Sequence, residues 1–283
     1  MKPSFYRTLL FATMLGASIS HGITIRMGSS ANNRFIGSPG ATENGSFLYG
    51  AYDFSGVGWN TSATAQSVTL ISDTHFVAAL HNLPGSSVSF RDMTGTVQTY
   101  SVSGYTTMSN ADYPFLLTSS DLVVGTLTGP VSSEINFYPL LDPSLSPVGQ
   151  DVLVYGQDGR VGENKISNIV AGGPDGGSTE GILTELVYVK AAGDPNDAYF
   201  SDGDSGGPSF IVGNDDELIL TGVHWLSGED ADNRYLYDTY TTAYIDQLNA
   251  VSGLTVTTSL IPEPSTGMLL GFAILTISLR RRR

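Results

Sequence analysis

The sequence predicts an all-β protein, either a barrel or a sandwich, and three observations lead to that class. Short stretches rich in Val, Thr, Tyr and Ser alternate apolar with polar residues, as strands with one buried face do. Clusters of Gly, Asp and Asn separate these stretches, and few segments have the spacing of an amphipathic helix. The predicted strands include residues 67–71, 97–102, 151–155, 182–189 and 217–223.

The composition excludes several function classes. Residues 23–260 contain seven Lys and Arg against 26 Asp and Glu, a net charge of −19. Such a surface repels nucleic acid and anionic membranes, so neither is expected as a partner of this region. The chain has no cysteine, and at 283 residues it is long enough for a hydrophobic core that needs no disulfide bonds.

The first 22 residues are typical of a secretory signal peptide. Lys2 and Arg7 supply its positive start, residues 8–19 are apolar, and small residues near its end permit cleavage. Cleavage after Gly22 would leave Ile23 as the first residue of the mature chain. A buried N-terminal helix is the alternative interpretation.

The C-terminal region, residues 256–283, combines three features. A Pro-Glu-Pro sequence at 262–264 precedes an apolar stretch at 267–279 and four arginines at 280–283. As a helix, about 15 residues extend about 22 Å, which is shorter than the roughly 30 Å hydrocarbon core of a bilayer. Local thinning of the bilayer or snorkelling of the arginines must therefore help this short segment to span.

This arrangement resembles the PEP-CTERM sorting signal of Gram-negative bacteria, which implies an exosortase-type sorting enzyme as a partner. It also implies a protein that is secreted or displayed on the cell surface, anchored in the inner membrane only transiently and only through this segment. A simple tail anchor is the alternative, and it too places the remainder of the chain outside the cytoplasm.

The sequence Gly-Asp-Ser-Gly-Gly-Pro at 203–208 carries most of the functional information. A serine on a tight turn can expose its Oγ to a substrate carbonyl, and the backbone N–H groups of Gly203 and Ser205 can converge where an oxyanion develops. The motif resembles the active-site motif of the chymotrypsin/trypsin-like serine proteases. The alternatives are a turn without function and an EF-hand calcium loop. The EF-hand needs Asp or Asn at position 206 and Glu at 213, and both are Gly, so no metal or cofactor is expected.

The resemblance implies a histidine and an aspartate upstream of the serine. His21 lies in the signal peptide, which leaves His75, His81 and His224 as candidates for the general base. His81 closes the apolar stretch 76–80, which resembles the family segment that ends in the catalytic histidine. His75 precedes this stretch, next to a turn, and is expected at the surface.

For the carboxylate that orients the histidine, the sequence offers Asp121 and Asp112. Asp121 begins the apolar stretch 121–127, which resembles the family strand that carries the catalytic aspartate, whereas a turn signal follows Asp112. A carboxylate at the start of a buried strand is costly without a hydrogen-bonded partner, and His81 would be such a partner. Intervals of 40 and 84 residues separate His81, Asp121 and Ser205, against roughly 45 and 93 in the family template.

The resemblance covers residues 23–255 and implies two six-stranded antiparallel β-barrels with a short C-terminal helix at 241–248. The proline-rich stretch 130–147 is the expected connection between the barrels. The implied activity is that of a serine endopeptidase, which hydrolyses protein or peptide substrates through an acyl-enzyme intermediate.

The implied mechanism assigns a role to each member of a triad. His81 takes the proton of Ser205 as its Oγ attacks a peptide carbonyl, Asp121 fixes the imidazole tautomer, and the amides of Gly203 and Ser205 bind the oxyanion. Activity is expected to fall at low pH, because a protonated histidine cannot act as a base.

Three residues are expected to shape the substrate pocket. Tyr199 stands six residues before the serine, where the family carries the residue at the pocket floor. Trp225 belongs to the stretch 222–226, which is similar to the family strand that pairs with the substrate backbone. Leu226 stands where a glycine usually keeps the pocket open, so a shallow pocket for small or medium apolar P1 side chains is expected.

In the family, a freed N-terminal amine pairs with the aspartate that precedes the catalytic serine. Here these residues would be Ile23 and Asp204, with proteolysis near Arg34 as a fainter alternative. His224 replaces a serine that often supports the catalytic aspartate, and the usual activated N-terminal sequence has no clear counterpart. If no N-terminus inserts, the domain would be a zymogen or a catalytically inactive surface-binding module, which is the alternative function.

Overall fold

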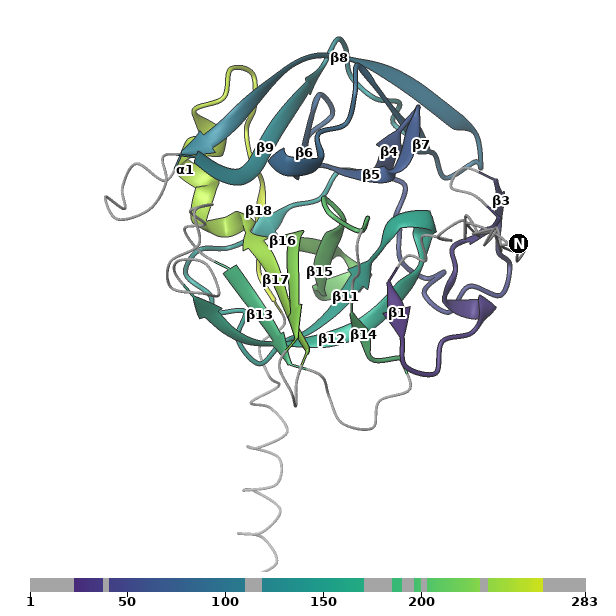
Figure 1. Ribbon diagram of the computed structural model, residues 1–283. Helices are drawn as coiled ribbons and strands as arrows, with labels where there is room; N and C mark the ends of the chain where they lie inside the picture. The colour runs from purple at the N-terminus through teal and green to yellow at the C-terminus, as the bar shows by residue number, and fades with distance from the viewer. Residues whose placement is uncertain are drawn as a thin grey trace, which may run out of the picture.

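Two closed six-stranded antiparallel β-barrels, packed against each other, make up the fold (Figure 1). The structure is a computed structural model, and the residues it describes are 23–37, 41–109, 119–170, 185–189, 196–199, 203–229 and 234–261. The predicted fold class, two six-stranded barrels with a short C-terminal helix, is confirmed.

The first barrel closes in the strand order β4–β5–β6–β9–β8–β7. Its strands are β4 (Val57–Asn60), β5 (Ala63–Leu70), β6 (His75–Ala79), β7 (Ser87–Arg91), β8 (Val97–Ser109) and β9 (Ser119–Leu127). Its interior contains a cluster of buried apolar side chains that includes Leu70, Phe76, Val88, Phe90 and Val123. Neighbours of these residues along the strands, among them Val77 and Leu122, belong instead to a separate cluster on the other face of the sheet.

The second barrel has the order β15–β11–β12–β13–β17–β16 and closes through pairing of β15 with β16. Its strands are β11 (Asp151–Tyr155), β12 (Val161–Val170), β13 (Glu185–Val189), β15 (Pro208–Val212), β16 (Leu218–Glu229) and β17 (Arg234–Tyr240). Two short strands, β10 (Leu140–Leu141) and β18 (Thr258–Ser259), extend this sheet by parallel pairing beside β16.

Residues 128–150 connect the barrels, since β9 ends at Leu127 and β11 begins at Asp151. This connection includes the stretch 130–147 that was expected to join them. Another apolar cluster contains residues of both barrels, among them Val77, Leu122, Phe210 and Leu220, and fills the interface between them.

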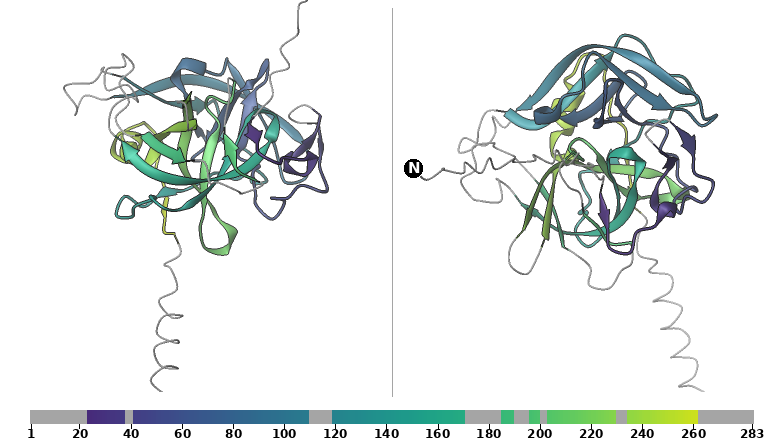
Figure 2. Two further views of the ribbon diagram at one scale, coloured as in Figure 1. Left: turned by 60° about the horizontal axis from the view of Figure 1, so that its bottom comes forward. Right: turned by 45° about the vertical axis from the view of Figure 1, so that its right-hand side comes forward.

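The predicted C-terminal helix begins as a 3-10 turn, Thr241–Tyr244, and continues as α1 (Ile245–Asn249). Tyr244 and Leu248 bury one face of it against the cluster between the barrels. Figure 2 shows it from two further sides, beside the edges of both barrels.

The N-terminal segment packs along the second barrel before the first barrel begins. In it, β1 (Thr24–Ile25) pairs with β14 (Ala198–Tyr199), and β2 (Phe35–Ile36) pairs with β3 (Thr42–Glu43). Within the described ranges, no helix is long and apolar enough to cross a membrane. The predicted signal peptide, residues 1–22, and the apolar stretch 267–279 lie outside those ranges.

Candidate active site

Three of the predicted site residues form a continuous line of hydrogen bonds. His81 Nε2 lies 2.8 Å from Ser205 Oγ, and His81 Nδ1 lies 2.8 Å from Asp121 Oδ2. The backbone N–H of His81 also donates to Asp121 Oδ1 at 2.9 Å, so both carboxylate oxygens contact the same residue. Asp121 is buried, whereas the side chain of His81 is 37% exposed and faces solvent beside Ser205.

Strand pairing in the first barrel brings His81 and Asp121 together. Strand β6 pairs with β9 in antiparallel register, with Ala79 opposite Leu122. His81 follows in the 3-10 turn η2 (Leu80–Asn82), and Asp121 precedes Leu122 in β9. The rival carboxylate of the sequence analysis, Asp112, lies outside the described residues.

Ser205 lies on a loop of the second barrel that presses against the first. Gly203 and Gly206 both have positive φ, +99° and +88°, which a residue with a side chain rarely adopts. A Cβ on Gly206 would lie 2.8 Å from the carbonyl oxygen of Ser67 in β5, so the backbone of the loop lies directly against that strand. The Gly206 N–H donates to His224 O at 2.9 Å, which fixes the loop on β16.

Asp204 is fully buried behind the serine, next to the first described residue of the chain. Its Oδ1 accepts a hydrogen bond of 2.8 Å from the backbone N–H of Gln157. A Cβ on Gly156 would lie 2.7 Å from Asp204 Oδ1 and 2.8 Å from the backbone nitrogen of Ile23, so these two atoms border one small space. Ile23 is also fully buried, among the apolar side chains of the second barrel.

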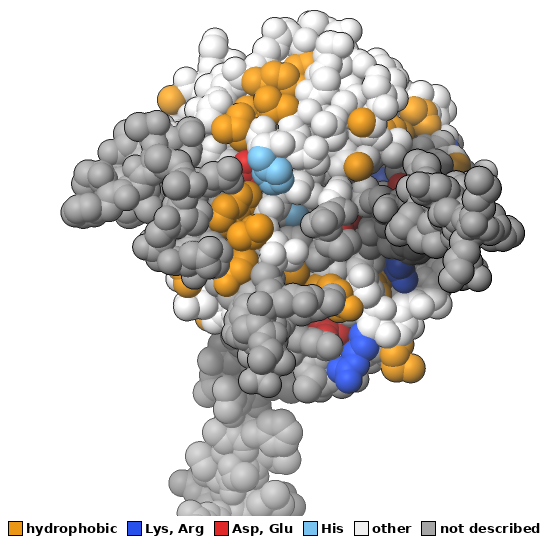
Figure 3. Space-filling model, in the orientation of Figure 1, with side chains coloured by type: hydrophobic (Ala, Val, Ile, Leu, Met, Phe, Trp, Pro, Cys, Tyr) orange, Lys and Arg blue, Asp and Glu red, His pale blue; other side chains and the backbone are white. Residues whose placement is uncertain are grey.

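The three predicted pocket residues lie on two elements. Tyr199, in β14, is half-buried and packs against the core of the second barrel. Trp225 is buried and lies at an irregularity in the pairing of β16 with β17, whereas the neighbouring Leu226 is 38% exposed. Figure 3 shows one face of the molecule, where hydrophobic side chains border histidine atoms and few of the coloured side chains are Lys or Arg.

The side chains of the two other histidines that were considered as bases have hydrogen-bond partners other than Ser205. His224 is buried in β16, and its Nδ1 lies 2.8 Å from Oδ1 of Asp238, which is buried in β17. His75 was expected at the surface, and this prediction is wrong because His75 is only 2% exposed. Its Nδ1 lies near the hydroxyls of Ser72 and Thr74, and the turn at Gly253, after α1, covers its ring.

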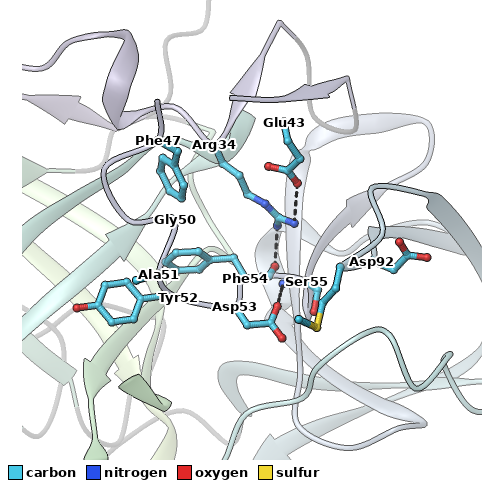
Figure 4. Close-up of a pocket in the computed structure, with 11 residues that line it drawn as sticks. Arg34, Glu43, Phe47, Gly50, Ala51, Tyr52, Asp53, Phe54, Ser55 and Asp92 are labelled. Carbon is cyan, nitrogen blue, oxygen red and sulfur yellow. Dashed lines mark hydrogen bonds and ion pairs between the residues drawn. The ribbon is translucent and has the colours of Figure 1, made fainter. Parts of the chain in front are cut away.

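A pocket of about 260 Å³ lies on another side of the molecule, between the N-terminal segment and the first barrel (Figure 4). Its wall contains the buried Arg34, which pairs with Glu43 at 3.2 Å and donates to Phe54 O at 2.7 Å. Burial alone would lower the pKa of Arg34, but the nearby Tyr155 and Glu43 raise it, so this cation stays charged. Arg34 also fixes the turn after Tyr155, because its backbone N–H donates to Gly159 O.

Sequence reasoning missed two amides that contact the serine loop, Asn82 and Gln157. Asn82 Nδ2 donates to Ser205 O at 3.1 Å, and the carboxamide of Gln157 lies against Gly203. The sequence carries one signal for Asn82, its position directly after His81. No pattern singled out Gln157, because its contacts are to residues about 46 positions further along the chain.

The two six-stranded β-barrels and a C-terminal sorting signal define a class, an exported double-barrel β protein. Residues 260–283 match the family model described as the PEP-CTERM protein-sorting motif, which confirms that prediction and indicates recognition by an exosortase-type enzyme. A search of curated proteins gave no match. Among solved structures, the chain is similar to the human heparin binding protein. The two are 17% identical, with 73% of this chain and 95% of that chain covered and a TM-score of 0.48.

Proposed function

We propose that this protein is a secreted serine endopeptidase in which Ser205 is the nucleophile, His81 the general base and Asp121 the residue that orients His81. One observation carries the proposal: the two hydrogen bonds of 2.8 Å that join Asp121, His81 and Ser205 across two barrels. These residues are 40 and 84 positions apart, so local sequence alone does not bring them together. A nucleophile, a base and a buried orienting carboxylate in this order are what acyl transfer requires.

The chemistry follows from the positions of the atoms. Ser205 Oγ attacks the carbonyl carbon of a peptide bond while its proton passes to His81 Nε2. The carboxylate of Asp121 accepts a hydrogen bond from His81 Nδ1–H and stabilises the imidazolium that forms. The N–H groups of Gly203 and Ser205 stabilise the oxyanion, and His81 then gives its proton to the leaving amine. Water then attacks the acyl-enzyme: His81 takes a proton from the water and gives it to Ser205 Oγ, which leaves as the acid product is released.

For the substrate, we propose a preference for small or medium apolar P1 side chains. Tyr199 stands at the proposed pocket floor and offers no carboxylate to an Arg or Lys side chain, and Leu226 narrows the proposed entrance. Cleavage of a peptide library with mass-spectrometric readout tests this preference. Cleavage only after Arg or Lys would contradict it.

Maturation is proposed to activate the enzyme directly. Signal peptidase would remove residues 1–22, and the new amine of Ile23 would pair with Asp204, whose burial favours a cationic partner. The common space that Ile23 N and Asp204 Oδ1 border beside Gly156 supports this pairing. A mature domain that begins at Ile23 should acylate at least 10-fold faster than one with a single extra N-terminal glycine. Equal rates would contradict the proposal.

The proposed organisation assigns residues 23–255 to the protease domain and residues 256–283 to sorting. An exosortase-type enzyme would process the C-terminal signal in the inner membrane of a Gram-negative bacterium, after which the domain is released or retained at the cell surface. Mass spectrometry of the exported protein tests this, because processing near Pro262 shortens the chain by about 20 residues, while a permanent anchor leaves it intact.

Hydrolysis of a protein substrate tests the activity itself. The mature domain should cleave casein into new peptides, and Ser205→Ala and His81→Ala variants should leave casein intact at equal concentrations and with unchanged thermal stability. If the folded wild-type domain also leaves every protein and peptide substrate intact, the alternative, a surface-binding module without catalysis, replaces this proposal.

A further inference from the structure

The side-chain amide of Asn82 connects the two barrels at the catalytic serine. Its nitrogen donates one hydrogen bond to Ala65 O in β5 at 3.2 Å and a second to Ser205 O at 3.1 Å. Both N–H bonds of the amide are therefore used, one within the first barrel and one across to the second. Asn82 is half-buried, so water competes only partly for these bonds.

The location of this bridge is significant because His81, in the first barrel, must meet Ser205, in the second. The His81–Ser205 hydrogen bond is exposed to solvent, and such a bond contributes little to fixing two domains relative to each other. The chain has no cysteine, so no covalent cross-link supports this junction. The bonds of Asn82 act one residue from His81 and on the main chain of Ser205 itself.

A second contact at the junction shows how closely the serine loop approaches the first barrel. The position of a Cβ on Gly206 would lie 2.8 Å from Ser67 O and 3.4 Å from the backbone nitrogen of Ala79. Backbone therefore lies against backbone here, and small shifts of the loop are limited on that side. The Asn82 amide supplies the polar connection on the side of the nucleophile.

We propose that Asn82 is a positioning residue that sets the distance between His81 Nε2 and Ser205 Oγ by tying the main chain of Ser205 to η2 and β5. This inference rests on the proposed function. Removing both hydrogen bonds should let Ser205 move relative to His81. A misplacement of about 1 Å can reduce a reaction rate about 100-fold, so acylation should slow by about 10- to 100-fold. Substrate binding should change little, because Asn82 holds the main chain of the nucleophile and does not line the proposed pocket.

The variant that tests this is Asn82→Leu, which keeps a similar volume and removes both donors. Asn44→Leu is a matched control, because the half-buried Asn44 amide also donates to two backbone carbonyls, Ser30 O and Asn33 O, at 2.8 and 2.9 Å. Asn82→Ser is a second variant if the leucine does not fold. Acylation is followed with 4-nitrophenyl acetate as the burst of 4-nitrophenolate, and each rate is divided by the serines titrated with a fluorophosphonate.

The proposal predicts a 10- to 100-fold slower acylation per titrated site for Asn82→Leu, a KM within about threefold of wild type, and wild-type values for Asn44→Leu. In a His81→Ala background, Asn82→Leu should change the residual rate less than twofold, because the distance it controls no longer matters. A merely structural role would lower the titrated fraction and leave the rate per site unchanged, which would overturn the inference alone. An equal loss in both backgrounds would also overturn it. A folded wild-type domain that shows no burst would overturn the proposed function, and this inference with it.

Discussion

Replacing Gly156 with alanine tests the arrangement around Asp204. Gly156 has φ −88° and ψ 174°, an extended conformation that alanine also adopts without strain, so the substitution causes no backbone strain. The added methyl would lie 2.7 Å from Asp204 Oδ1 and 2.8 Å from Ile23 N, and it would also meet the Ile23 side chain. All three neighbours are in fully buried residues, so they have little room to move away.

The size of the effect follows from two opposing contributions. Inserting a methyl group into a packed interior costs about 1–3 kcal/mol, while replacing glycine restricts the unfolded chain and returns about 0.4–1 kcal/mol. The midpoints of these two ranges give a net loss of stability of about 1.3 kcal/mol, or a fall in Tm of about 3–5 °C for a domain of this size. Displacement of Ile23 from Asp204 should in addition slow acylation by Ser205, by about 100-fold for a shift near 1 Å.

The assay is thermal unfolding together with the 4-nitrophenyl acetate burst, measured on the mature domain. Gly104→Ala is the control, because nothing lies within 4 Å of the position of its Cβ. This control should retain wild-type stability and acylation. If Gly156→Ala also retains wild-type stability and acylation, then Ile23 and Asp204 do not share this space in the mature protein, and the proposed pairing is wrong.

Three further predictions concern individual side chains. Asp121→Asn should slow acylation by roughly 10³- to 10⁴-fold at pH 7, because the amide no longer holds His81 in the reactive tautomer. Stopped-flow measurement of the burst tests this, and a much smaller loss of rate would contradict the role of Asp121. Burial lowers the pKa of His75, so the unfolded chain binds a proton there more readily, and stability should fall as pH drops below about 6.5. His75→Gln should flatten this part of a plot of Tm against pH, and an unchanged slope would contradict the assignment. The hydroxyl of Thr94 and other donors lower the pKa of Asp92 to about 2, which adds stability above pH 4 that is lost toward pH 2. Thr94→Val should therefore destabilise the fold by about 1 kcal/mol at pH 7 and by less at pH 2, as chemical denaturation at both pH values would measure.

Much of the fold could be predicted because the alternation of apolar and polar residues along a strand shows which of its faces is buried. The strand predicted at 151–155 from its alternation coincides with β11. The helix at 241–248, which the family resemblance implied, coincides with the 3-10 turn and α1. The two-residue strands β1 and β14 carry no such pattern, since pairing with a distant partner alone defines them. The burial of His75 was missed for the same reason, because the segment that covers it lies about 178 residues further along the chain.

The candidate site could likewise be predicted only in part from the sequence. Ser205, His81 and Asp121 could be selected because each stands in a local sequence that is similar to a known motif. Asn82 has only its position directly after His81 as a signal, because its hydrogen bond is to the main chain of Ser205 and depends on no particular partner side chain. Gln157 has no such signal, because it meets Gly203 and Asp204 only in the folded chain. The pair of His224 with Asp238 was also missed, since two polar residues on adjacent strands meet only through the register of β16 and β17.

Whether Ser205 is an activated nucleophile can be measured by the intact mass of the protein after fluorophosphonate treatment. The mature domain beginning at Ile23 is treated beside a Ser205→Ala variant of equal thermal stability. If Ser205 is the nucleophile, the wild-type domain should gain one adduct and the variant none. A folded wild-type domain that gains no adduct, or a variant that is labelled equally, would contradict it.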